Sequence, residues 1–178
     1  ISRGNIVLEI LKNKNEIKSI KFLQNITLSS YESFNIIIAD RKEAYWAKNT
    51  EENKLVIEKI PLGLSMIDAF DLNDISSSRI KKNYDNIKKN ILNNPNNWLI
   101  WKKILSSKNK KNSYACINRD LNHLSFGTVS SSLIALPSKL SKEDNQLPIW
   151  MYTNKKPSEN NFNKINIKKM FNNIKNES

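Results

Sequence analysis

The sequence predicts a mixed α/β protein of the α+β type, with mostly antiparallel sheets and helices on one face of each sheet. Along the 178-residue chain, the spacing of apolar residues changes from steps of three and four, typical of helices, to short runs of strand length. The change occurs twice, so a helix pair and a strand group are followed by a second helix pair and strand group. Short turns join most expected strands, which favours antiparallel pairing because parallel neighbours need a long crossover.

In the first half of the chain we expect two helices followed by three strands. Apolar residues on one side predict helices over residues 5–13 and 16–24. Residues 34–48 predict a hairpin, because two runs of strand length flank a short polar turn. Imperfect alternation predicts a further strand over residues 54–60, which we expect to continue through residues 61–66.

In the second half, three serines at residues 76–78 can cap an amphipathic helix. Its apolar positions are Ile80, Tyr84, Ile87 and Ile91. A shorter helix is expected over residues 98–105. The expected strands span residues 113–119, 129–136 and 146–153, with a connection over residues 120–128. We divide the chain into a partial domain, residues 1–153, and a Lys- and Asn-rich C-terminal tail, residues 154–178, expected to be loosely held.

The net charge of +12 suggests a polyanionic partner, but its composition favours another explanation. Lysine supplies 25 of the 29 basic residues, whereas dedicated readers of phosphates and bases favour arginine. Lysine is accompanied by 28 Asn and 24 Ile, and all three have A/T-rich codons. Residues 79–111 hold ten basic residues against Asp85 alone, which we interpret as solvated helix faces. We therefore expect no specific nucleic-acid partner.

Scarce residue types exclude several classes of site. One Cys excludes an internal disulfide framework, and one His excludes HExxH and every two-His metal centre within the chain. Three scattered glycines exclude a P-loop and a dinucleotide fingerprint. From these counts of Cys, His and Gly together we expect no cofactor and no metal. No apolar run approaches membrane-span length and no signal peptide is recognisable, so we expect a cytoplasmic protein without a membrane span. The start at Ile1 suggests a fragment or a processed product.

The stretch from Gly127 to Ser132 is the strongest candidate for a binding site. Three consecutive serines at the start of a strand are costly to bury unless each hydroxyl finds a partner. The candidate binding residues are Gly127, Thr128, Ser130 and Ser131. Simple solvation of a strand edge is an equally good interpretation of the same pattern.

Other chemically active residues have simpler structural interpretations. Cys116 lies in a strand-like context and is better interpreted as a small buried hydrophobe than as a nucleophile. His123 lies in a polar connection without a positioned partner, and Trp98 with Trp101 fits a helix core better than a ligand cage. The carboxylates of residues 71–74 fit a loop that caps the following helix. No catalytic residue is therefore assigned.

Several short stretches together resemble the NRDE family, also described as the transport and Golgi organisation family. The likeness is greatest to its bacterial members, covers about residues 2–153, and corresponds to the later two-thirds of such a protein. The matching stretches are Ser2-Arg3-Gly4, residues 34–40, Gly63-Leu64-Ser65, residues 71–74 with Arg79, residues 98–105, residues 126–133 and Pro148-Ile149-Trp150. Their order and spacing make the set more specific than any single piece.

The resemblance implies an N-terminal-nucleophile-hydrolase-like αββα sandwich that lacks its N-terminal strands. The family resembles amide-cleaving enzymes such as choloylglycine hydrolases, in which a Cys next to the initiator Met is the nucleophile and its free α-amine is the base. The NRDE family takes its name from an Asn-Arg-Asp-Glu motif near the N-terminus, preceded by such a Cys, and the segment with both is absent here. Asn118-Arg119-Asp120 spells part of the motif late in the chain, and we transfer no role to it. Many relatives have Arg where Val129 stands and Asn where Met66 stands.

Three functions follow as expectations. The leading one is hydrolase-like activity on amide (C–N) bonds in the complete protein, with this chain alone inactive. The second is a non-enzymatic binding protein that handles haem or lipid, so the expected partner is a small-molecule ligand or substrate. The third is a basic nucleic-acid-binding domain that uses residues 79–111.

Overall fold

The structure of the chain is a computed structural model, and it describes residues 1–13, 16–91, 98–107, 118–121, 124–137 and 147–168. Within these residues it contains four α-helices and three antiparallel sheets, which confirms the predicted mixed α/β class. The chain divides into two compact units, Ile1–Ser65 and Met66–Ser178, and each is described by itself.

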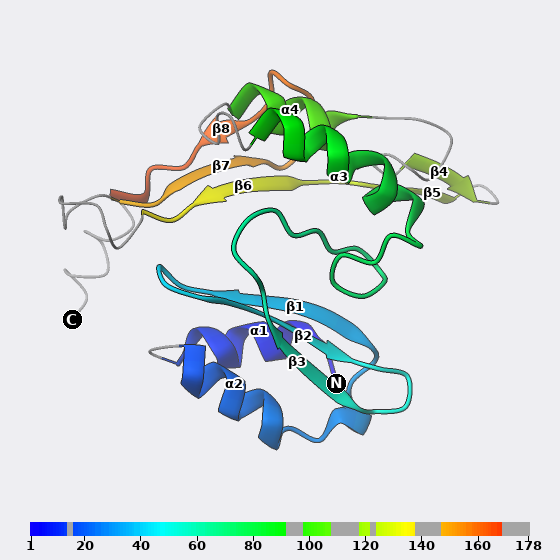
Figure 1. Cartoon of the computed structure of the whole chain (residues 1–178), viewed down its shortest axis with the longest axis vertical. Coiled ribbons are helices and arrows are strands. Elements are labelled where there is room, and N and C mark those ends of the chain that lie inside the picture. The colour runs from blue at the N-terminus through cyan, green and yellow to red at the C-terminus, as the bar shows by residue number, and fades with distance from the viewer. Residues whose placement is uncertain (14–15, 92–97, 108–117, 122–123, 138–146, 169–178) are drawn as a thin grey trace. The chain divides into compact units, whose positions relative to one another are not determined.

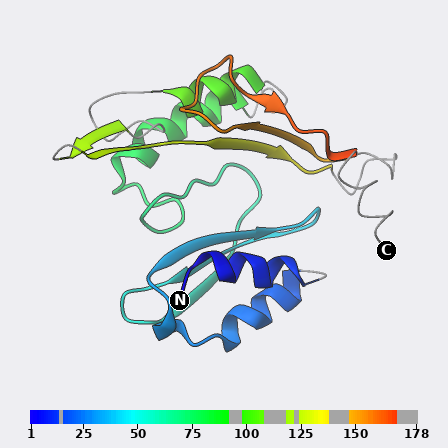
Figure 2. The ribbon, with the colours of Figure 1, turned by 180° about the vertical axis from the view of Figure 1, so that it is seen from behind.

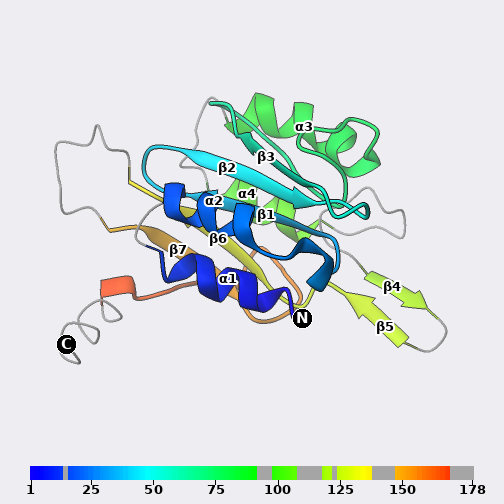
Figure 3. The ribbon, with the colours of Figure 1, turned by 90° about the horizontal axis from the view of Figure 1, so that it is seen from below.

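The first unit is a helix pair on a three-stranded sheet. Its helices are α1 (Gly4–Leu11) and α2 (Glu16–Asn25), and a short 3-10 turn, Leu28–Ser30, follows. Its strands are β1 (Phe34–Ala39), β2 (Ala44–Asn49) and β3 (Leu55–Lys59), paired antiparallel in the order β1-β2-β3. Both helices lie on the same face of the sheet (Figures 1 and 2) and side by side (Figure 3). Both predicted helices and the hairpin over residues 34–48 are confirmed.

The core of the first unit lies between this helix pair and one face of the sheet. The buried members are Ile6, Ile10, Leu23, Ile38 and Ala47. The strand members share a face because Ile36 pairs with Ala47, and Ile38 lies two residues further along β1. The partly buried side chains packed around them are Phe22, Ile26, Tyr31, Phe34, Ile36, Leu55 and Ile57.

The predicted continuation of the third strand through residues 61–66 is wrong. The strand ends at Lys59, and the backbone N–H of Ile60 still donates to Ala44 O at 2.8 Å. Pro61 has no N–H with which to extend the ladder. Gly63 has a φ of 104°, a conformation that glycine adopts without the steric cost other residues incur.

The second unit also combines a helix pair with antiparallel strands. Its helices are α3 (Ser78–Ile91) and α4 (Trp98–Ser106), close to their predicted bounds. Its strands are β4 (Asn118–Leu121), β5 (Leu124–Gly127), β6 (Ser131–Ala135), β7 (Ile149–Thr153) and β8 (Asn163–Lys164). Strands β6, β7 and β8 form one sheet in that order, and α3 and α4 lie on one side of it (Figures 1 and 2).

The connection predicted over residues 120–128 is wrong in the part that the structure describes. Residues 118–121 and 124–127 pair as an antiparallel hairpin, from Asn118 with Gly127 to Leu121 with Leu124 (Figure 3). The polar composition suggested a loop, but pairing between neighbouring segments determines the structure here. The rest of the strand expected over residues 113–119 lies outside the described residues.

Part of the segment expected to be a loose tail packs against the second unit. Strand β8 pairs with β7 through Met151 with Lys164 and Tyr152 with Asn163. Phe162 and Pro157 are buried. This anchoring covers residues up to 168, where the described part of the chain ends.

A buried serine caps α3, as the run of serines predicts. The backbone N–H of Ile80 donates to Ser77 Oγ at 3.3 Å, and Ser77 Oγ donates to the Asp68 carboxylate. The helix then buries Ile80, Asn83 and Ile87 on one face. Asn83 in this face was not predicted, and its side-chain N–H donates to Arg79 O of the same helix at 2.8 Å.

Leu23→Ala tests the core of the first unit. Leu23 is fully buried, so we expect the free energy of unfolding to fall by about 2–5 kcal/mol, measured by urea denaturation followed by circular dichroism. The matched control is Leu11→Ala, since Leu11 is 74% exposed and its truncation should change stability by less than about 0.5 kcal/mol. Equal losses in the two variants would contradict this core.

Candidate functional site

The predicted binding stretch joins two strands of the second unit. Gly127 ends β5 and pairs with Asn118, while Ser131 begins β6 and pairs with Thr153. Thr128 is half-buried, whereas Ser130 is exposed. The stretch therefore offers polar groups at an accessible connection.

An aromatic surface follows directly from this stretch on β6 and β7. Ser132 pairs with Tyr152 and Ile134 pairs with Trp150, so these four side chains share one face of the sheet. Trp150 Nε1 donates to Ser132 Oγ at 3.2 Å, and the Trp150 and Tyr152 rings meet edge to face with centroids 6.2 Å apart. Ile134 is 61% exposed, whereas its neighbour Leu133 is buried on the opposite face. We call these four residues the β6–β7 face.

The remaining sequence candidates contribute no site within the described residues. Cys116 and His123 lie outside those residues. Trp98 and Trp101 are both half-buried on α4, and none of the residues of this helix is fully buried. Asp74 Oδ1 accepts from the backbone N–H of Ser76 at 2.8 Å, which fits the predicted loop before α3.

The sequence did not reveal a charged cluster at the ends of β2 and β3. Lys59 Nζ donates to Glu43 Oε1 at 2.5 Å, and Tyr45 Oη donates to Glu43 Oε2 at 2.6 Å. These two hydrogen bonds, that from Lys59 first, lower the pKa of Glu43, and the bond to Glu43 raises the pKa of Lys59. Glu43 is thus held as a carboxylate and Lys59 as an ammonium, which disfavours either as a general base near neutral pH.

A groove of about 640 Å³ lies beside this cluster. It is lined by residues 40–44, from the β1–β2 turn to the start of β2, and by residues 59–63, from the end of β3 onward. The turn is rigid, because Asp40 Oδ1 accepts from the backbone N–H groups of Lys42 at 2.6 Å and Glu43 at 2.9 Å. Charges of both signs line the groove, so it favours no single ligand charge.

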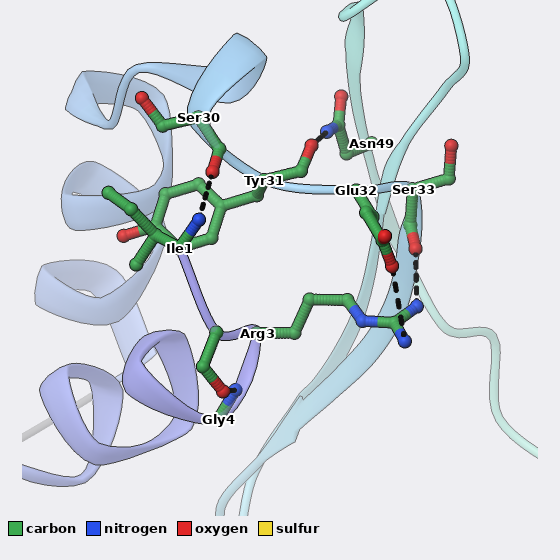
Figure 4. A network of polar contacts seen from close by, with 9 residues as sticks. Ile1, Arg3, Gly4, Ser30, Tyr31, Glu32, Ser33 and Asn49 are labelled. Carbon is green, nitrogen blue, oxygen red and sulfur yellow. Dashed lines mark hydrogen bonds and ion pairs between the residues drawn. The ribbon is translucent and has the colours of Figure 1, made fainter.

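A second polar network ties the start of α1 to the segment before β1 (Figure 4). Arg3 donates to Ser33 O at 3.0 Å and lies 3.6 Å from the Glu32 carboxylate. Ser2 Oγ accepts from the backbone N–H of Gly4 at 3.3 Å. The buried Asn49 amide donates to Leu28 O and Tyr31 O, each at 3.3 Å, from the end of β2. Ser2-Arg3-Gly4 therefore has a structural role here.

Two kinds of feature are absent from the residues that the structure describes. They contain no group of three or more His, Cys, Asp or Glu side chains that could hold a metal ion. They also contain no helix long and apolar enough to cross a membrane.

Glu43→Gln tests the pH dependence of the charged cluster. A lowered pKa in the folded state stabilises the protein above the ordinary carboxylate pKa, and this contribution is lost as pH falls through the lowered value. A raised pKa of Lys59 acts oppositely: its contribution is lost as pH rises through the raised value. We expect Glu43→Gln to lower the Tm at pH 7 and to reduce the drop in Tm between pH 7 and pH 3.

The control for this experiment is Glu58→Gln, an exposed carboxylate on the neighbouring strand β3. It should leave the drop between pH 7 and pH 3 close to that of the unchanged protein. A Glu43→Gln variant with an unchanged acid response would contradict the assigned role.

Comparison with known proteins identifies no relative, so a function is argued from the residues themselves. No protein-family model, no curated protein and no solved structure matches the chain.

Proposed function

We propose that residues 1–153 belong to an NRDE-family protein that hydrolyses amide (C–N) bonds in the cytoplasm. The ordered set of short motifs that resembles this family carries the proposal. Support also comes from the repeated arrangement of a helix pair with antiparallel strands, once in each unit. Ser2-Arg3-Gly4 leads into α1, which begins at Gly4, and Gly63 adopts a positive φ after β3. Such positions constrain the backbone, which fits a fold-defining role for these motifs.

We further propose that the complete fold is an αββα sandwich. In the first unit, Ile37 lies on the sheet face opposite to the helix pair and is 54% exposed, whereas its pair Trp46 on the same face is buried. In the second unit, the β6–β7 face carries Ile134, Trp150 and Tyr152. Exposed apolar surface on small sheets favours packing against a second layer, and face-to-face packing of two antiparallel sheets would cover both.

In this proposal the nucleophile is not among the described residues. The family resemblance places it on a Cys upstream of Ile1. Ser77 donates to a carboxylate, but it is 3% exposed and caps α3, so it is inaccessible to a substrate. Gly127, Thr128, Ser130 and Ser131 are the residues proposed to contact the small-molecule substrate, because they form an accessible polar connection. The chain by itself is then inactive.

A second candidate function is non-enzymatic binding of haem or a lipid. The observation that favours it is the β6–β7 face, where Trp150 and Tyr152 lie beside the exposed Ile134. An open apolar face with aromatic rings suits a flat or extended apolar ligand. This function needs the face to stay open, whereas the sandwich covers it.

The coding sequence upstream of Ile1 tests the proposed hydrolase. We expect it to encode a Cys directly after the initiator Met, and the protein expressed with this segment should cleave members of an N-acyl amide panel. Replacement of that Cys by Ala should abolish cleavage without lowering the Tm, while the chain from Ile1 should be inactive. An upstream sequence without this Cys would refute the nucleophile.

A double-mutant cycle with Ile37→Lys and Ile134→Lys tests the sandwich. If the two sheet faces pack together, each lysine lowers stability, and the double variant loses less than the sum by at least about 0.5 kcal/mol, because either lysine alone already disrupts the packing. Ile75→Lys is the control, since Ile75 is exposed in a loop and its replacement should have little effect. Additive losses within about 0.3 kcal/mol would contradict the sandwich and favour the open face of the second function.

A further inference from the structure

Helix α3 separates into a buried side and a charged side. Ile80, Asn83 and Ile87 are buried, and at 100° per residue they fall within one narrow arc. The opposite arc is exposed and entirely polar. Its members are Lys81, Lys82, Asp85, Asn86, Lys88 and Lys89.

The four lysines form two rows along the exposed arc. Lys81 and Lys88 are seven residues apart, as are Lys82 and Lys89, so each pair is separated by about 10.5 Å along the axis with little rotation. Asp85 lies between the rows and is the only acidic residue of the helix. Lys88 Nζ also lies 5.9 Å from the centre of the Tyr84 ring at the border of the arc. The face therefore presents a concentrated positive charge on a rigid element.

We propose that this lysine face of α3 binds the phosphate backbone of nucleic acid without reading its sequence. Lysine is a compact point charge that pairs with phosphate, whereas contacts to bases favour the planar fork of arginine. The exposed arc carries no apolar side chain that could enter a bilayer, which disfavours an anionic lipid surface. Backbone binding of this kind agrees with the expectation that the chain has no specific nucleic-acid partner.

Base-composition drift explains why the residues are lysines, and a solvated helix face would have the same composition. A binding site on α3 and nonspecific attraction by the net charge predict different affinities when lysines outside α3 are removed. A polyanion bound at α3 depends on the position of the charges, whereas nonspecific attraction depends only on their number.

The experiment compares two variants that each lose four positive charges. One carries Lys81→Gln, Lys82→Gln, Lys88→Gln and Lys89→Gln on α3. The control carries Lys21→Gln, Lys42→Gln, Lys155→Gln and Lys164→Gln, all exposed and outside α3. Glutamine keeps a helix propensity close to that of lysine, and circular dichroism verifies that both variants fold.

Binding is measured by fluorescence anisotropy with a labelled mixed-sequence DNA duplex of 20 base pairs over a range of salt concentrations. We expect the α3 variant to bind at least about tenfold more weakly. The plot of log K against log salt has a negative slope, and its magnitude should decrease by about one for each phosphate that a lysine no longer neutralises. The control should lose less than about threefold in affinity.

Three results would overturn the proposal. Equal losses of affinity in both variants would assign DNA binding to the net charge of the protein. No binding of the duplex by the unchanged protein would exclude the proposed site. Vesicles of equal phosphatidylglycerol and phosphatidylcholine provide the third test. If they bind the protein through the same lysines and the duplex does not compete, the face is a lipid site instead.

Discussion

The first unit depends on the packing of one helix pair against one face of a sheet. Ile6 and Ile10 of α1 and Leu23 of α2 are buried against Ile38 and Ala47, and these five side chains form the buried cluster between the helices and the sheet. Strand pairing alone gives marginal stability in water, so a small sheet depends on burying an apolar face, and here the helix pair buries it. The paired strands and the turns that join them therefore stabilise the first unit only while the helix pair is packed on the sheet.

Polar contacts fix the ends of the same elements. Arg3 links the start of α1 to the segment before β1, Asp40 closes the β1–β2 turn, and Glu43 with Lys59 joins β2 to β3. Arg3 and Lys59 are exposed, and Asp40 and Glu43 are half-buried, so each contact contributes little to stability, but together they fix where helices and strands begin and end. The charged cluster is better understood as part of this framework than as acid–base machinery, since its partners hold each group in its ordinary charged form.

The sequence predicted local features well and contacts between distant residues poorly. Both helices of the first unit and its hairpin were predictable because apolar spacing and a short polar turn are local patterns. Strand β5 was not predictable, because its polar sequence resembles a loop and its conformation depends on pairing with β4. The hydrogen bond from Ser77 to Asp68 spans nine residues, and that from Lys59 to Glu43 spans sixteen. Nothing in the local pattern of either segment identifies such a partner.

The candidate site shows the same limit. The serines after Gly127 would be costly to bury, yet Ser130 is exposed and bears no such cost. The aromatic surface beside them arises only when β6 pairs with β7, which places Trp150 opposite Ile134 across sixteen residues of chain. A sheet with helices on one side and apolar residues on the other is half of a packed core. The β6–β7 face can pack against another sheet or bind a ligand. Which of the two covers it determines whether the serines after Gly127 line a cleft.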